Sequence, residues 1–141
     1  MNAISEKIHE LHFKDTAPGK RRKTRVLLII TQLVLGGGTK VALDIATHLH
    51  RHPDFDVHMI TGPIAAGYVD LMHLAYEQGI PTQVVPSLVN HINPIANLKA
   101  IAEIRRIIVQ GNYDIVHTHT KVAGVVGRLA ARAAKARVIV H

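Results

Sequence analysis

Apolar and polar residues are arranged along this chain in alternating blocks that predict strands and helices in turn. The first apolar run, Val26–Ile30, is short and continuous, which is typical of a strand buried on both faces of a parallel sheet. Further strands are predicted at 56–60, 80–85, 113–119 and 137–140, and apolar residues at helical spacing predict helices at about 39–51, 67–78, 98–111 and 122–134. Because the links are short, this order predicts an α/β domain with a parallel sheet of about five strands covered by helices.

The composition narrows the classes of protein to which the chain can belong. Its 141 residues correspond to about one domain, and 48% of them are hydrophobic, which is enough for a substantial core. The absence of cysteine excludes a disulfide framework, a zinc ribbon and a thiol nucleophile, and it fits the reducing cytoplasm. No apolar run is long enough to cross a bilayer, and the N-terminus lacks the apolar core of a secretory signal. We therefore expect a soluble, cytoplasmic protein.

The net charge of +7 is concentrated near the N-terminus. Residues 1–24 are predicted to form a basic, flexible leader ahead of a domain at 25–141. The run Lys20–Lys23 is suited to anionic lipid head groups, which would give a peripheral contact with the inner face of a membrane; the alternative is a solvated tail. No aromatic residues are interleaved with this run to stack on bases, so no nucleic-acid partner is predicted.

Three consecutive glycines, Gly36–Gly38, join the first predicted strand to the first predicted helix. Without side chains the backbone can approach an anion closely, and the N–H groups at the start of the helix point towards it. Thr39 and Lys40 add a hydroxyl and a cation at the same place. The spacing fits neither the dinucleotide-binding fingerprint, because residue 41 is Val, nor a P-loop. The turn is therefore either a phosphate-binding site or a tight connection that binds no ligand.

The fourth predicted strand ends in His117 and His119, which are followed directly by Thr120 and Lys121. Ligands of open parallel sheets collect beyond the carboxyl ends of the strands, so polar side chains here predict a binding or catalytic edge. The two histidines should share one direction, because side chains alternate along a strand. No metal is predicted, since a third ligand is not evident nearby. A neutral imidazole that hydrogen-bonds a sugar or phosphate fits, with His119 as the better candidate; the alternative is a solvated strand end with a helix cap.

The last predicted helix is unusually rich in small residues, which include Gly124 and Gly127. Glycine weakens a helix, so we expect close packing or the close approach of a ligand at these positions. Arg128 and Arg132 fall on one face of the same helix. They form either a solvated basic face or, for Arg128, a contact with a phosphate or a partner domain.

Three segments of the chain together resemble the family-4 glycosyltransferases of the GT-B fold; one of them, Val57–Pro63, fits the strand and turn between the two described next. The first is Val26–Thr31 leading into Gly36–Ala46, which resembles the first strand and the Gly-Gly turn of the family. The second is Asp114–His119 with Gly124 and Gly127–Ala131 of the following helix, which resembles the family's "DIVHTH…AG..GRLAA" segment. The resemblance spans almost all of the predicted domain, and the second segment is its most specific part.

This resemblance implies an N-terminal, Rossmann-like three-layer domain that mainly faces the acceptor of a retaining sugar transfer. The donor, a nucleotide sugar such as a UDP- or GDP-sugar, would bind mostly to a second Rossmann-like domain, with no essential metal and no other cofactor. Carried over by position, Gly37 and Gly38 would lie near the donor diphosphate or the acceptor. His119 would be the catalytic residue near the transferred sugar, joined by His117. Thr120 and Lys121 would line the cleft. Apart from the resemblance, the residues themselves predict Thr39, Lys40 and Arg128 as further substrate-binding positions.

Two features limit what the resemblance implies. The loop at 90–94 lacks the Arg and Asp that the family often carries, so acceptor contacts are not expected there. The chain also stops at His141, directly after a predicted strand, and contains no second domain. We therefore expect a fragment that is inactive alone, from an enzyme that transfers a sugar to a glycan, lipid or small-molecule acceptor.

Two other functions stay open at this point. A sugar-nucleotide epimerase with the same GT-B fold would share all of these features. A self-contained flavodoxin-like or receiver-like binding module would share the alternation of strands and helices. A receiver, however, would need an acidic pocket near the first strand, and Ile29–Thr31 contains no carboxylate.

Overall fold

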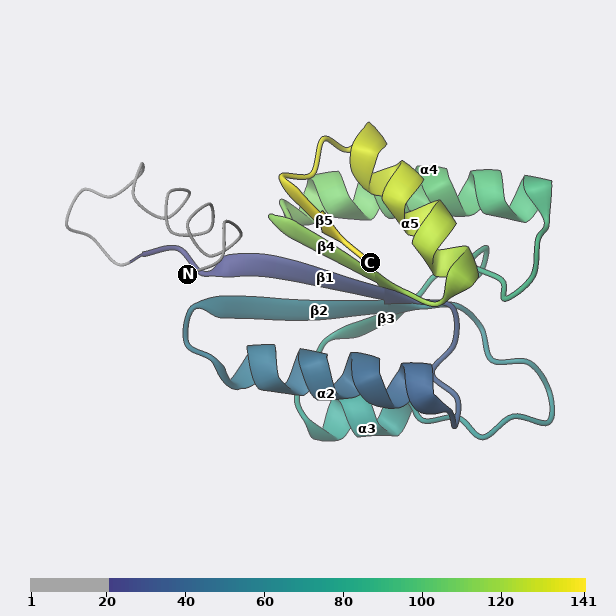
Figure 1. The fold of residues 1–141 in the computed structure, drawn as a ribbon, viewed down its shortest axis with the longest axis horizontal. Helices are drawn as coiled ribbons and strands as arrows, with labels where there is room; N and C mark the ends of the chain where they lie inside the picture. Colours follow the sequence, from purple (N-terminus) through teal and green to yellow (C-terminus); the bar gives the residue numbers. More distant parts are fainter. Residues whose placement is uncertain (1–20) are drawn as a thin grey trace.

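A parallel sheet organises the part of the chain that the structure describes. The computed structural model describes residues 21–141, so the predicted leader up to position 20 lies outside the described residues. The strands are all parallel and stand in the order β3-β2-β1-β4-β5 (Figure 1). Their bounds are β1 (Thr24–Ile30), β2 (Phe55–Thr61), β3 (Thr82–Val84), β4 (Ile115–His119) and β5 (Val138–Val140). The helices are α2 (Gly37–Arg51), α3 (Met72–Glu77), α4 (Pro94–Gly111) and α5 (Lys121–Ala133). The predicted α/β fold with about five parallel strands is confirmed.

The continuous apolar run of β1 is explained by its place in the middle of the sheet. Val26, Leu28 and Ile30 pack on the side of α2 and α3. Leu27 and Ile29 pack on the side of α4 and α5. All five side chains are at most 1% exposed, so both faces of this strand belong to the core.

The two helical layers and the strand order create a point where the chain changes direction. α2 and α3 cover one face of the sheet, and α4 and α5 cover the other (Figure 1). The chain adds β2 and β3 on one side of β1 and then crosses over to add β4 and β5 on the other side. The loops that leave the carboxyl ends of β1 and β4 therefore diverge. In open α/β sheets, ligands bind in the crevice at such a switch point.

The second predicted helix, at 67–78, is much shorter in the structure, where α3 spans only Met72–Glu77. Gly67 has a left-handed backbone (φ 88°), and Asp70 pairs with Val34 in an isolated antiparallel bridge. These tertiary constraints keep the residues before α3 out of the helix.

The third predicted helix begins earlier than its apolar spacing indicates. Asn93 caps α4 by accepting a hydrogen bond from the backbone N–H of Ala96 (3.0 Å), and Pro94 occupies the first turn. Within residues 21–141, no helix has the length and apolar character needed to cross a membrane.

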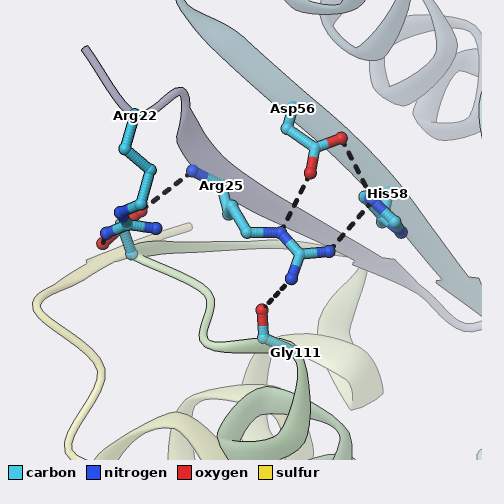
Figure 2. A network of polar contacts seen from close by, with 6 residues as sticks. Arg22, Arg25, Asp56, His58 and Gly111 are labelled. Atoms are coloured by element: carbon cyan, nitrogen blue, oxygen red, sulfur yellow. Dashed lines mark hydrogen bonds and ion pairs between the residues drawn. The ribbon is translucent and has the colours of Figure 1, made fainter. Parts of the chain in front are cut away.

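At the amino-terminal edge of the sheet, Arg25 of β1 forms hydrogen bonds with residues of the neighbouring elements (Figure 2). Its Nε donates to Asp56 on β2 (2.9 Å), and its Nη1 donates to the carbonyl oxygen of Gly111 at the end of α4. His58 Nε2 lies 3.3 Å from Arg25 Nη2 and 3.2 Å from Asp56 Oδ1. The backbone N–H of Arg25 donates to Asp114, just before β4 (2.9 Å). One residue thus ties β1, β2 and the entry to β4 together at the edge away from the switch point.

Candidate active site

The carboxyl ends of β1 and β4 lie side by side at the switch point. Ile30 pairs with His119 and Leu28 pairs with His117 in the parallel ladder. His119 therefore lies beside the last residue of the central strand, directly at the crevice that the topology creates.

His117 and His119 lie on the same face of β4, as the alternation of side chains predicted. Their ring centroids are 4.2 Å apart. Ile115, two residues earlier on the same face, packs with the cluster formed by α2 and α3, whereas Val116 packs on the other side with α4 and α5. Both imidazoles remain partly exposed because α2 packs against β1 and β2 and leaves this end of β4 open.

Both histidines are neutral at physiological pH. The pKa of His119 is lowered to about 4, chiefly by burial and also by the neighbouring His117 and His141, which repel a second positive charge. Burial and His141 also lower the pKa of His117. His119 Nε2 is buried and has no hydrogen-bond partner among the described residues. A buried nitrogen in this condition favours a polar ligand group that would pair with it.

The low pKa of His119 predicts a loss of stability in acid. The unfolded chain binds the proton near pH ~6.5, but the folded chain binds it only near pH ~4, so unfolding is favoured as the pH falls through this interval. Because the side chain is partly exposed, we expect a loss of only about 1–2 kcal/mol in the free energy of unfolding. The loss is measured by urea denaturation of the wild type and of His119→Gln, each at pH ~6.5 and at pH ~4. Equal acid sensitivity of the two proteins would contradict this assignment.

The glycine turn lies next to the end of β4. α2 begins at Gly37 with Gly36 as its N-cap, and no side chain caps its first N–H groups. Around Gly36 and Gly37 there is open space, so the backbone there is accessible. A side chain at Gly38 would lie 3.8 Å from the methyl group of Thr120. The structure therefore places Gly38 beside Thr120, as expected if both segments serve one site.

Three of the other predicted site residues, Thr39, Lys40 and Arg128, form contacts within their own helix or with the turn that precedes it. Thr39 is 4% exposed and its hydroxyl donates to the carbonyl oxygen of Gln32 (3.4 Å), so it stabilises the turn itself. Lys40 is exposed and lies 3.4 Å from Asp44 one turn along α2. Arg128 lies on the outer surface of α5, where its Nε donates to the carbonyl oxygen of Gly124 (2.6 Å). Lys121, by contrast, is exposed at the first position of α5, directly after Thr120.

A chain of hydrogen bonds that the sequence did not reveal links the loops at this edge. Thr31 Oγ1 donates to Asn90 Oδ1 (3.1 Å), and its second contact is with Thr120 Oγ1 (2.9 Å). Because Thr31 has one hydroxyl proton, Thr120 must be the donor between the two threonines. Asn90 Nδ2 then donates to Gln32 Oε1 (3.2 Å), and Gln32 Nε2 donates to the carbonyl oxygen of Pro63 (3.1 Å). The loops after β1, β2, β3 and β4 are thereby connected.

Thr120 has a backbone conformation that is rare for its residue type. Its φ of 72° and ψ of 157° lie in a region that is occupied almost only by glycine. Strain of this kind costs on the order of 1–3 kcal/mol and is found mainly at functional sites. The hydrogen bond to Thr31 helps to hold Thr120 in this conformation beside the glycine turn.

The small residues of α5 are explained by close packing, as predicted. A side chain at Gly127 would lie 2.6 Å from the methyl group of Thr118, which is 1% exposed. A side chain at Gly124 would collide with the ring of His141. Thr118 Oγ1 in turn lies 2.9 Å from His141 Nδ1. Among residues 21–141, no three His, Cys, Asp or Glu side chains are grouped so that they could share a metal ion.

The topology and the residues at its switch point define the N-terminal type of Rossmann-like domain found in GT-B glycosyltransferases. Residues 36–141 match the family described as the glycosyl transferase 4-like domain. The chain belongs to this family. The predicted resemblance is thereby confirmed, and the match argues against a flavodoxin-like binding module.

Known proteins with similar sequences or structures agree with this assignment. The chain is 29% identical over 122 residues to the UDP-Gal:alpha-D-GlcNAc-diphosphoundecaprenol alpha-1,3-galactosyltransferase of Escherichia coli. This match covers 84% of this chain and 29% of that enzyme. MurG of Acinetobacter baumannii has a similar structure, with a TM-score of 0.65 and 24% identity over 84% of this chain and 33% of that protein. A putative UDP-N-acetylglucosamine 2-epimerase of Listeria monocytogenes is also similar (TM-score 0.64, 16% identity, 84% of this chain and 31% of that protein). The two structural likenesses concern the fold, and the chain spans about a third of the length of each protein.

Proposed function

We propose that this chain is the acceptor-side part of a retaining glycosyltransferase. The enzyme would move a sugar from a nucleotide-sugar donor, such as a UDP- or GDP-sugar, to a glycan, lipid or small-molecule acceptor. The observation that carries the proposal is the membership of residues 36–141 in the glycosyl transferase 4-like family. The neutral histidines and the accessible glycine turn at the switch point support it.

In this proposal, each group at the carboxyl edge has a role that suits its chemistry. The backbone N–H groups at Gly37 and Gly38 approach the donor diphosphate or the acceptor. His119, neutral at physiological pH, hydrogen-bonds the transferred sugar through the nitrogen that has no partner, with His117 beside it. Thr120 and Lys121 line the cleft. A second domain of the same protein holds most of the donor, so this chain alone is expected to be inactive, and no metal or other cofactor takes part.

A lipid-linked acceptor is favoured among the possible acceptors. The Escherichia coli relative acts, by its name, on a GlcNAc-diphosphoundecaprenol. An acceptor of this chemistry lies in a membrane, which suits a protein at the cytoplasmic face of that membrane. We propose that Lys20–Lys23 of the leader contribute a peripheral contact with anionic lipids there.

A sugar-nucleotide epimerase is the second candidate function, since the Listeria monocytogenes protein shares the fold. Its identity to this chain is 16%, whereas the galactosyltransferase is 29% identical. Transfer is therefore favoured over epimerisation.

A transfer assay on the full-length protein that contains this chain tests the proposal. The protein is incubated with radiolabelled UDP-galactose, UDP-glucose or GDP-mannose and with a polyprenyl-diphosphate-linked GlcNAc. We expect the label to move from the nucleotide to the lipid with the anomeric configuration retained, and we expect no transfer by the 141-residue chain alone. Conversion of UDP-GlcNAc to its C2 epimer without any acceptor would instead establish the epimerase, and inversion at the anomeric carbon would contradict the retaining mechanism.

A further inference from the structure

His141 follows β5 directly and lies between the end of β4 and the start of α5. Its Nδ1 is 2.9 Å from Thr118 Oγ1 and 3.2 Å from the carbonyl oxygen of the same residue. Its ring also fills the space beside Gly124, where a side chain would collide with it. Thr118 is 1% exposed and Gly124 is buried, so one imidazole joins the inner surfaces of β4 and α5.

The hydrogen bonds around Thr118 determine which nitrogen of His141 carries the proton. Thr118 Oγ1 donates to the carbonyl oxygen of Val140 (3.2 Å), and this bond uses its only proton. His141 Nδ1 must therefore be the donor in its contact with Thr118 Oγ1. The carbonyl oxygen of Thr118, which can only accept, faces the same nitrogen. When the ring is neutral, the proton is thus on Nδ1 and Nε2 carries none.

These contacts flank the part of the candidate site whose backbone is strained. Thr118 is followed directly by His119 and Thr120. Thr120, with its φ of 72°, is the N-cap of α5, and its carbonyl oxygen accepts a hydrogen bond from the N–H of Gly124 (2.8 Å). His141 therefore contacts both the residue before this segment and the residue that closes the first helical turn after it.

We propose that His141 is a positioning residue for the candidate active site. Through its hydrogen bond to Thr118 it holds the end of β4, so that Thr120 keeps its strained backbone and His119 keeps its direction. Strain of this kind persists only where the surrounding structure opposes its release. Burial is the main cause that lowers the pKa of His117 and of His119, and the charge of His141 contributes at both, so its ring lies close enough to act on the site. The consequence for sugar transfer rests on the proposed function, whereas the effect on local structure does not.

Hydrogen exchange of the full chain, followed by NMR, tests the inference without an enzyme assay. Thr118→Val and His141→Phe each remove one partner of the hydrogen bond and keep the approximate shape of the side chain. Each is expected to speed the exchange of the Gly124 N–H about tenfold, because the lost bond no longer opposes opening of the first turn of α5. The double variant should exchange no faster than Thr118→Val alone, since the same bond is lost only once. His141→Asn, whose side-chain N–H can replace Nδ1–H, should exchange more slowly than His141→Phe.

The position of the proton on His141 is a second test, and it needs no variant to fold. At about pH 8.5, where an ordinary histidine is neutral, nitrogen-15 NMR of the wild type should show the proton of His141 on Nδ1.

Kinetics of the full-length protein separate positioning from a merely structural role. Thr118→Val and His141→Phe are expected to lower kcat for sugar transfer about tenfold and to change KM less than about twofold, because most of the donor would be bound by the second domain. A merely structural role would lower the free energy of unfolding without changing kcat of the folded protein.

Two matched controls place similar substitutions elsewhere in the sheet and helices. Thr61→Val removes a buried hydroxyl at the end of β2, and His50→Phe replaces a histidine of α2 whose ring faces Gly79. Both should match the wild type in exchange of the Gly124 N–H and in kcat.

Three results would overturn the inference. They are unchanged Gly124 exchange in both Thr118→Val and His141→Phe, a neutral His141 without a proton on Nδ1, and wild-type kcat of both variants in a protein that transfers sugar. Absence of any transfer by the wild type would contradict the proposed function instead, and the exchange and the proton position would still decide this inference.

Discussion

Gly62→Ala is expected to lower the free energy of unfolding by at least about 3 kcal/mol. Gly62 is buried directly after β2, and its N–H donates to the carbonyl oxygen of Thr31 (3.0 Å). A side chain at this position would collide with the carbonyl oxygen of Leu88 and would lie 2.6 Å from that of Thr31. Both obstacles are backbone atoms, so no change of side-chain rotamer relieves the overlap. The midpoint of urea denaturation measures the effect.

Gly36→Ala is the matched control for this substitution. Gly36 has an extended backbone and open space around it, so we expect a change below about 1 kcal/mol. If Gly62→Ala were as stable as this control, the loops after β1, β2 and β3 would not be packed as the structure has them.

The second large effect concerns His119 in the full-length protein. His119→Ala is expected to lower kcat/KM for sugar transfer by about 100-fold, because the hydrogen bond from its buried Nε2 to the transferred sugar would be lost. His119→Asn keeps a hydrogen-bonding group and should retain more activity than the alanine variant. The rates are measured with the donor and acceptor that the transfer assay identifies.

His73→Ala is the control for the effect on activity, since His73 is exposed on α3 and is not among the residues assigned to the site. It should transfer sugar at the wild-type rate. Full activity of His119→Ala would remove this residue from the proposed mechanism, even if the protein proves to be a transferase.

The elements of the fold were predictable wherever they depend on local periodicity. The apolar run of β1 and the helical spacing of α4 report burial directly, so both were found from the sequence. The residues before α3 could not be predicted in this way. Their conformation depends on the bridge between Val34 and Asp70, which are far apart in the sequence.

The candidate site was predictable only in part. The shared direction of His117 and His119 follows from the geometry of a strand, and the structure confirms it. Thr31 was missed although it follows β1 as Thr120 follows β4, and the same rule about strand ends applies to it. Asn90 gave no signal, because it reaches Thr31 from a loop 59 residues away.

Thr39 shows how a local motif can mislead. Its position after three glycines suggested a hydroxyl that faces a ligand. The helical period gives a different answer, because Thr39 falls on the same face of α2 as Ala42, Leu43 and Ala46, and all four are buried. The amphipathic pattern of the helix was therefore the better guide to this residue.

The hydrogen-bond chain at the carboxyl edge has one direction along its whole length. The only hydroxyl proton of Thr120 points to Thr31, and the proton of Thr31 points to Asn90. Towards the cleft, Thr120 Oγ1 therefore presents lone pairs and no proton. It can accept a hydrogen bond from a hydroxyl group of a ligand, but it offers nothing to a phosphate or carbonyl oxygen. At Thr120 Oγ1, the edge of the sheet therefore selects hydrogen-bond donors of a ligand. The N–H groups of the glycine turn beside it select hydrogen-bond acceptors.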